Sequence, residues 1–470
     1  MTFLSRSLLL APALLVSFSA AAVDLREVFD LAVENDPQIG AAEAVYLASS
    51  EGVNQARAGM LPNVSVGGST SDNWRRSPDP QTGIDADPTS PTFGEFIITG
   101  PAAPAEEFNS HGWAATLSQP VFRLDRWFRF RQSKNLEAQA LATFAAEQQN
   151  LIIRVADTYL NILEAQDTLS AANAEREAVK RQLEQVQQRF DVGLVAITDV
   201  LEAQAAYDTS TVTVINAEGN QNIAFEPLFR LTGQGFRDVG SLAEEFPVKY
   251  PDPLDEEAWV ASALANNLDI AAAREGVNAA RRQLYIARSG HLPTVDAQAQ
   301  WQHSTSGGQS FLGNTLDQRV YSVQINIPVY AGGSTRSVAR QSGYQLEQAQ
   351  LVLDLTQRQI VETTRNLYTA INTDVARVRA RLRGIESSQS ALDATQTGYE
   401  VGTRNIVDVL QAQQRLFASQ LQFAQARYQY IRNTFRLKQV VGSLSPEDIY
   451  ELNNFINNAS TVERITPTTR

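Results

Sequence analysis

The chain contains no cysteine and only three histidines among its 470 residues. The lack of cysteine excludes disulfides, a cysteine nucleophile and a lipid anchor attached to a cysteine near the mature N-terminus. The histidines, His111, His291 and His303, are too scattered for a metal site. Motifs of the GxSxG, P-loop and HExxH types are also absent. We therefore expect a protein that is not an enzyme and holds no metal or cofactor.

Long apolar runs are missing beyond the N-terminus. At the N-terminus itself, Arg6 precedes an apolar run over 8–18, and the small residues Ala20 and Ala22 follow. This pattern predicts a secretory signal peptide over 1–22, because the run is too short for a membrane helix. No later stretch reaches 18 apolar residues, so no transmembrane helix is expected. The net charge of -13 argues against nucleic acid as a partner.

Glycine and proline are absent from residues 123–192. A continuous helix over these 70 residues would be roughly 105 Å long, too long to fold around one compact core. It is typical of a coiled-coil element. A second long helix carries a heptad seam that alternates steps of three and four residues. Its members are Val407, Leu410, Gln414, Phe417, Leu421, Ala424, Tyr428, Ile431 and Phe435.

The chain does contain a repeat of itself. VGLVAITDVLEAQ at 192–204 returns as VGTRNIVDVLQAQ at 401–413, at a constant offset of 209 residues, and ARAGMLP at 56–62 returns as ARSGHLP at 287–293. Such self-similarity indicates a duplicated structural unit. We expect the two repeats to cover 23–231 and 258–442, with a mixed segment over 232–257. The segment 443–470 follows, and its tail after Asn457 is expected to be disordered.

Each repeat also contains two stretches in which apolar and polar residues alternate. We expect strands near 62–74, 111–121, 293–303 and 318–329, with solvent-exposed loops over 77–96 and 304–317. A soluble sheet with one buried face and an outer-membrane β-barrel both fit this pattern. The signal peptide and the lack of an apolar helix favour the barrel. So do aromatic residues placed where a membrane interface would lie: Phe122, Trp127, Phe128 and Phe130.

The number of strands constrains the assembly. Four strands cannot close a barrel, and open strand edges are not tolerated in lipid. Two chains would give eight strands, whose interior is filled by side chains, whereas three chains would give twelve. A membrane-spanning form must therefore be an oligomer, and a conducting one needs at least three copies.

The motifs at the helix turns resemble those of TolC-type outer-membrane channel proteins over nearly the whole mature chain. The tightest correspondences are QRFDVGLVAITDV at 188–200, GYEVGTRNIVDVL at 398–410, GHLPT at 290–294 and IPVYAGG at 327–333. The resemblance implies a mainly α fold with membrane β-structure, in which a homotrimer forms a 12-stranded barrel in the outer membrane of a Gram-negative bacterium. A long α-helical coiled-coil barrel would cross the periplasm. The missing cysteine disfavours the lipid-anchored branch.

The same resemblance implies an exit duct for tripartite efflux pumps or type I protein secretion. Its expected partners are a periplasmic adaptor, also called a membrane fusion protein, and an inner-membrane ABC or RND-type transporter. Their docking would open the duct. The alternative from another class is a non-conducting, surface-anchored coiled coil with a structural or adhesive role. The sequence does not choose between drugs and proteins as substrates.

The candidate functional residues lie where the long helices reverse direction, at Gly193 and Gly402. Asp199 and Glu202 share one helical face, and Asp408 and Gln411 hold the same places in the second repeat.

The resemblance implies that Asp408 lines an entrance ring. It also implies that Thr198 and Asp199 bond with Tyr399 and Arg404 to keep the entrance closed. Gln411 stands where the family pattern has a second Asp. The expected double acidic ring is therefore halved, unless Glu202 faces the lumen and restores the charge. The ordinary alternative is that these residues are solvated charges at helix ends.

Overall fold

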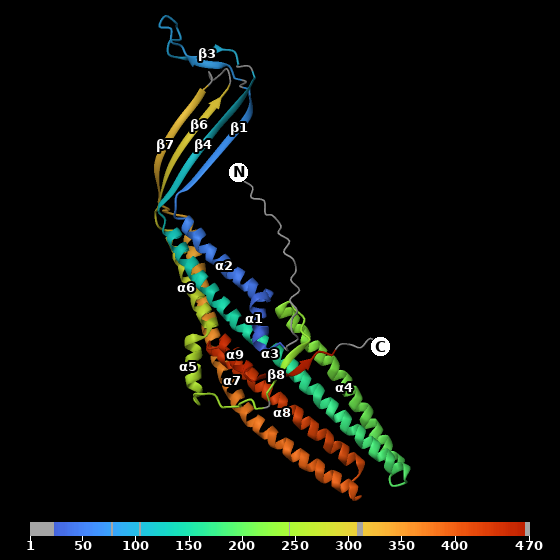
Figure 1. Cartoon of the computed structure of the whole chain (residues 1–470). Helices are drawn as coiled ribbons and strands as arrows, with labels where there is room; N and C mark the ends of the chain where they lie inside the picture. Colours follow the sequence, from blue (N-terminus) through green and yellow to red (C-terminus); the bar gives the residue numbers. More distant parts are fainter. Residues whose placement is uncertain (1–22, 77–78, 103–104, 244, 308–313, 466–470) are drawn as a thin grey trace. The chain divides into compact units, whose positions relative to one another are not determined.

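The computed structural model describes residues 23–76, 79–102, 105–243, 245–307 and 314–465 (Figure 1). The expected signal peptide lies outside these residues. The chain divides into two compact units. The sheet unit contains Tyr46–Ala140 and Ala273–Leu353, and the helical unit contains the other described residues. In the described parts of both units, no helix is long and apolar enough to cross a membrane.

The sheet unit is built on four antiparallel strands in the order β1-β4-β6-β7 (Figure 1). They are β1 (Asn63–Arg75), β4 (Glu106–Phe122), β6 (Thr294–Ser306) and β7 (Asn314–Asn326). Their registers are unbroken except near Pro120, which has no N–H to give to the ladder. The longest strand, β4, begins before the position that alternation alone indicates, because Arg75 and Glu106 continue the pairing with β1.

The segment 77–96 is not only a loop, as the sequence analysis expected. It contributes to a small hairpin of β2 (Gln81–Ile84) and β3 (Phe96–Gly100). Ile84 lies opposite Phe96, and such apolar pairs stabilise antiparallel strands. The connecting turn is held by Asp85, whose side chain accepts a 2.6 Å hydrogen bond from the Thr92 hydroxyl.

Four long helices form two antiparallel pairs, one for each repeat. Helix α3 (Leu124–Asp191) is followed by α4 (Ile197–Thr232), and α7 (Ser334–Glu400) is followed by α8 (Ile406–Val441). The 68 residues of α3 coincide almost completely with the stretch that lacks Gly and Pro. Shorter helices precede each strand pair: α1 (Leu25–Asn35) and α2 (Pro37–Ala58), then α5 (Glu256–Asn266) and α6 (Leu268–Ser289).

The heptad seam expected in the last long helix is correct only in its second half. There Tyr428, Ile431 and Phe435 are buried. In the first half the buried residues are Ile406, Val409, Ala412 and Leu416, which lie one or two positions before the expected ones. An α-helix drifts by about 20° per heptad relative to a strict seven-residue repeat, so the buried stripe shifts along a straight helix of this length.

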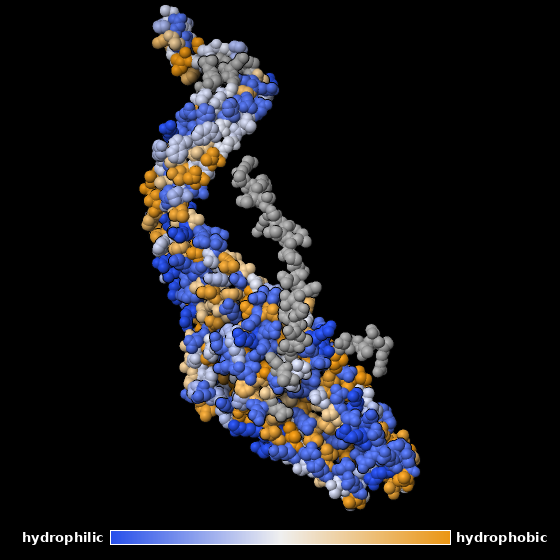
Figure 2. Space-filling model, in the orientation of Figure 1, coloured by the Kyte–Doolittle hydropathy of each residue, from blue (hydrophilic) through white to orange (hydrophobic). Residues whose placement is uncertain are grey.

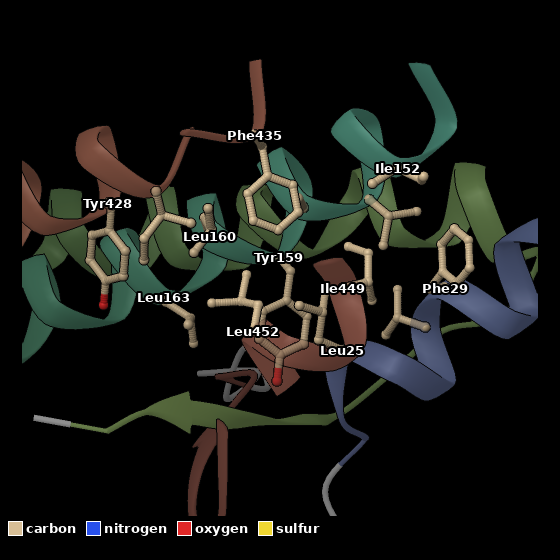
Figure 3. Close-up of a cluster of buried hydrophobic side chains, with 14 of the residues drawn as sticks. Leu25, Phe29, Ile152, Tyr159, Leu160, Leu163, Tyr428, Phe435, Ile449 and Leu452 are labelled. Carbon is tan, nitrogen blue, oxygen red and sulfur yellow. The ribbon is translucent and has the colours of Figure 1, made fainter. Parts of the chain in front are cut away.

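The main core of the helical unit joins α1, α3, α8 and α9 (Pro446–Asn453) (Figure 3). Tyr159 of α3 is fully buried at its centre, and its hydroxyl donates a 2.8 Å hydrogen bond to the carbonyl of Gly240. Phe29, Phe435 and Ile449 bring the other helices into the same cluster. Residues from both ends of the chain therefore stabilise the middle of the first long helix.

The tail after Asn457 is ordered through Glu463, contrary to the expected disorder. Strand β8 (Ile456–Glu463) pairs with β5 (Asp238–Leu242), which lies in the mixed segment between the repeats. Val462 is 2% exposed and joins the main core. The tail lacks a recognisable pattern because its partner strand is more than 200 residues away and the shared ladder is short.

Candidate functional site

The first helix reversal is a tight turn around Gly193. Its φ of 75° is left-handed, which favours glycine. The N–H of Leu194 donates to the Arg189 carbonyl at 2.8 Å, and the N–H of Gly193 donates to the Phe190 carbonyl at 2.8 Å. This pair of bonds satisfies the last carbonyls of α3 as a Schellman motif.

The second reversal repeats this geometry. Gly402 has a φ of 77°, the N–H of Thr403 donates to the Gly398 carbonyl at 2.8 Å, and the N–H of Gly402 donates to the Tyr399 carbonyl at 3.1 Å. The duplication read from the sequence is therefore preserved at the level of individual hydrogen bonds.

The two reversals belong to one small hydrophobic cluster, which we call the tip core. It combines residues of α3, α4, α7 and α8: Val186, Val200, Tyr399, Ile406 and Val409. The tip core holds both turns in a defined position, so the polar residues around it project from a rigid base.

Tyr399 is the polar member of the tip core. It is 4% exposed, and its hydroxyl is buried without a hydrogen-bond partner within the described chain. The Arg189 guanidinium lies over the ring, 4.8 Å from its centroid. Burial raises the pKa of Tyr399; the Arg189 cation opposes this, and the Asp199 carboxylate raises the pKa further. Because the hydroxyl is enclosed in the tip core, a bond to a group outside the chain would require the side chain to move.

Asp408 helps to cap the N-terminus of α8. Its N–H donates to the Asn405 side chain at 2.8 Å, and its carboxylate accepts the Asn405 N–H at 3.4 Å, which completes a capping box. The same carboxylate lies 3.9 Å from the guanidinium of Arg404. This geometry supports the ordinary interpretation of Asp408 as a helix-end charge, and its partial exposure leaves it accessible to solvent ions as well.

The other expected site residues lie close to these turns. Thr198, Glu202 and Gln411 are exposed, and Asp199 is half-buried in the first turn of α4. Within the described chain, neither Thr198 nor Asp199 is bonded to Tyr399 or Arg404. Arg404 is instead paired with Asp408.

Arg189 is the residue that the sequence analysis missed. At the 209-residue offset it corresponds to Gly398, while Val195 corresponds to Arg404. The two repeats thus place one arginine each at the turn, but on opposite sides of it. A Cβ on Gly398 would lie 2.8 Å from the Arg404 Cγ, so the missing side chain provides the room that Arg404 occupies. This exchange of positions was visible in the aligned repeats.

The expected interface aromatics lie where β4 ends and α3 begins. Phe122 and Trp127 are each 43% exposed, whereas Phe128 packs against Tyr285 at 5.3 Å between ring centroids. Trp127 and Phe130 lie 6.3 Å apart.

Beside these aromatics, Arg123 bridges Asp125 and Asp296, both at 3.1 Å. Aromatic rings next to a paired charge suit a boundary between apolar and aqueous surroundings.

Comparison with known families gives a match over most of the chain. The family described as "Outer membrane efflux protein" covers residues 28–234 and 259–443. The chain belongs to the outer membrane efflux protein family. The gap in the match coincides with most of the segment that joins the two repeats.

Individual relatives agree. The outer membrane protein TolC of Vibrio cholerae is 33% identical over 442 residues, which cover 93% of this chain and 95% of the relative. TolC of Escherichia coli is 32% identical, with 95% of this chain and 88% of the relative covered. The alkaline protease secretion protein AprF of Pseudomonas aeruginosa is 28% identical, with 93% and 88% covered. This protein is thus an outer-membrane channel protein that provides an exit duct for exported molecules.

The fold is shared with solved channels as well. The outer membrane protein VceC of Vibrio cholerae superposes with a TM-score of 0.72 at 17% identity, covering 89% of this chain and 96% of that one. The combination of a four-stranded sheet with long helix pairs is therefore the architecture of this family of channels.

Proposed function

We propose that three copies of the chain assemble into one duct, in which each copy contributes its four strands to a 12-stranded barrel. The observation that carries this proposal is the open sheet. Strands β1 and β7 each pair on one side only among the described strands. Unpaired strand edges are too costly in lipid, so neighbouring copies must supply their partners.

The sheet also presents the surface that a bilayer requires. Val64, Val66 and Tyr321 are between 67% and 72% exposed. An outward apolar band of this kind is what a membrane barrel turns towards lipid. The aromatic residues Phe122, Trp127, Phe128 and Phe130 would lie at one membrane interface.

The helix-reversal turns would form the periplasmic entrance. In a trimer, Asp408, Gln411 and Glu202 each become a ring of three. Thr198 and Asp199 of one copy would bond with Tyr399 and Arg404 of the next, and the Arg404 side chain, which is 62% exposed, supports this part of the proposal. Docking of a periplasmic adaptor and an inner-membrane ABC or RND-type transporter would break these contacts and open the duct.

Two measurements test the assembly. The mass of the detergent-extracted protein should be that of a homotrimer, and the purified trimer should conduct ions in a planar bilayer. A monomer that keeps its strand content would contradict the barrel. A stable trimer without conductance would instead support the non-conducting coiled-coil alternative.

The substrate class needs a separate experiment. Relatives carry names that refer to protease secretion and to efflux, so both classes remain candidates. Chemical crosslinking in whole cells, followed by purification of this chain, should recover an adaptor. The transporter that accompanies it, of the ABC or the RND type, would decide between protein secretion and drug efflux.

A further inference from the structure

The two faces of the four-stranded sheet differ sharply in chemistry. Thr116 of β4 lies opposite Ser65 of β1 and Gln300 of β6, whereas its neighbour Leu117 lies opposite Val64 and Ala299. Because successive side chains of a strand point to opposite faces, these two rows belong to different faces. The Thr116 row defines a polar face and the Leu117 row an apolar face.

The middle part of the polar face carries no charge. It consists of every second residue of 63–71, 110–118, 298–306 and 316–322, and none of these is Asp, Glu, Lys, Arg or His. The charged residues of this face lie at its two ends, Asp296 at one and Arg75 with Glu106 at the other. Serine hydroxyls and glutamine amides predominate. Ser110 and Ser306 are joined by a 3.1 Å hydrogen bond between their hydroxyls, and the Asn73 amide donates to Ser110 at 3.2 Å. These bonds hold the wall of a hollow of about 430 Å³.

Other charged residues of the same strands lie on the apolar face. The Asp317 carboxylate lies 2.7 Å from Nδ1 of His303, and Arg319 follows two residues later. Arg319 lies directly opposite Trp301, and Asp317 lies one row further from Tyr321, whose ring is 6.0 Å from that of Trp301. Figure 2 shows apolar side chains over the lower half of the sheet and polar ones over the upper half. Charge is thus present in these strands but absent from the middle part of the polar face.

We propose that this polar face is the inner wall of the pore within the outer membrane, and that its uncharged middle part forms an electrically neutral segment of the duct. The proposal rests on the trimeric duct proposed above. Hydroxyl and amide groups both donate and accept hydrogen bonds, so they can solvate solutes of either sign. Rings of like charge, in contrast, select ions by sign. This segment therefore passes cationic and anionic substrates alike, and the duct discriminates charge only outside it.

The natural lack of cysteine makes this proposal testable without a background of native thiols. Gln300→Cys places a thiol on the polar face, and Ala299→Cys places one on the apolar face of the same strand. Charged, membrane-impermeant thiol reagents should react with Gln300→Cys in reconstituted channels and reduce conductance. The neighbouring Ala299→Cys should stay unmodified, because lipid covers it. Thr116→Cys, on the adjacent strand, repeats the test in case the first variant does not assemble.

The neutrality of the segment is tested by comparing thiol reagents of opposite charge. At Gln300→Cys, the ratio of the reaction rates of a cationic and an anionic reagent should agree within about two-fold with the ratio for a free thiol in solution, because no fixed charges create a local potential. A ratio shifted by about ten-fold or more would overturn the neutral segment. Equal modification of Ala299→Cys and Gln300→Cys would overturn the assignment of the faces. An assembled trimer that does not conduct at all would instead refute the proposed duct.

Discussion

Tyr399 is the residue at which the closed entrance can be tested most directly. Its buried hydroxyl lacks a partner in the single chain, and an unsatisfied buried hydroxyl costs about 1–3 kcal/mol. If a neighbouring copy satisfies it, Tyr399→Phe should raise single-channel conductance by loosening the entrance. If the hydroxyl stays unpaired in the trimer, the substitution should increase thermal stability and leave conductance unchanged. Conductance and melting temperature, measured on one preparation, separate these outcomes.

Asp199 and Arg404 would provide the charged part of the proposed closure. An exposed ion pair contributes only about 0.2–1 kcal/mol, but three symmetric copies act together. We expect Asp199→Ala combined with Arg404→Ser to raise conductance and to make cells permeable to large antibiotics. Arg358→Ser is a suitable control, since it removes an exposed arginine that pairs with Asp354 within α7. Unchanged conductance in a correctly assembled double variant would refute the closure.

Asp408 should decide how the entrance treats cations. Three carboxylates around a narrow opening favour cations and bind multivalent ones. Asp408→Asn should weaken block by a trivalent cation by about ten-fold or more, and Gln411→Asp should strengthen it, since it restores a second ring.

Glu202→Gln is the informative comparison for this ring. If it weakens block as much as Asp408→Asn does, the first repeat supplies the second acidic ring. If neither change affects block, these carboxylates face away from the lumen and act only as helix-end charges, as the capping box of Asp408 also allows.

The reversal turns depend on two glycines with the same backbone conformation. A Cβ at Gly402 would meet no atom within 4 Å, so Gly402→Ala adds only the cost of a left-handed φ, about 1–2 kcal/mol. We expect faster amide hydrogen exchange at the ends of α7 and α8. Gly384→Ala is the matched control, because it lies inside α7 with equally open surroundings and should slightly stabilise the helix. Equal exchange in the two variants would show that the tip core, rather than the turn, sets local stability.

The C-terminal strand should be essential for the core that it covers. Val462 is buried between β8 and the helices, while its neighbour Thr461 is exposed. Val462→Asp should therefore destabilise the helical unit by at least about 2 kcal/mol, because it buries an unpaired charge. Thr461→Asp should change stability by less than about 0.5 kcal/mol. Denaturant midpoints of the two variants test this, and equal midpoints would mean that the strand is not part of the cooperative core.

Local patterns were sufficient for the elements that are long and periodic. The absence of Gly and Pro predicts α3 almost to its ends, and alternation predicts the four strands of the main sheet. The β5–β8 ladder and the β2–β3 hairpin were not recognised, because short strands carry little periodicity and their pairing depends on distant or irregular segments. At the turns, the repeat indicated Gly193 and Gly402. The position of Arg189 over Tyr399, however, follows from packing between helices that one helix's sequence does not encode.

The three-fold symmetry of the proposed trimer leads to a prediction about mixed assemblies. Each copy of the chain carries one set of entrance residues, so the number of copies sets the number of possible mixed entrances. When the wild-type chain and the Asp199→Ala, Arg404→Ser chain are co-expressed, a trimer can contain none, one, two or three altered copies. Single-channel recordings should therefore show four conductance classes in binomial proportions. A tag on one chain that shifts its electrophoretic mobility allows each mixed species to be purified and recorded separately, with tagged wild-type chains as the control. Three classes would indicate a dimer, whose eight strands would leave no open lumen.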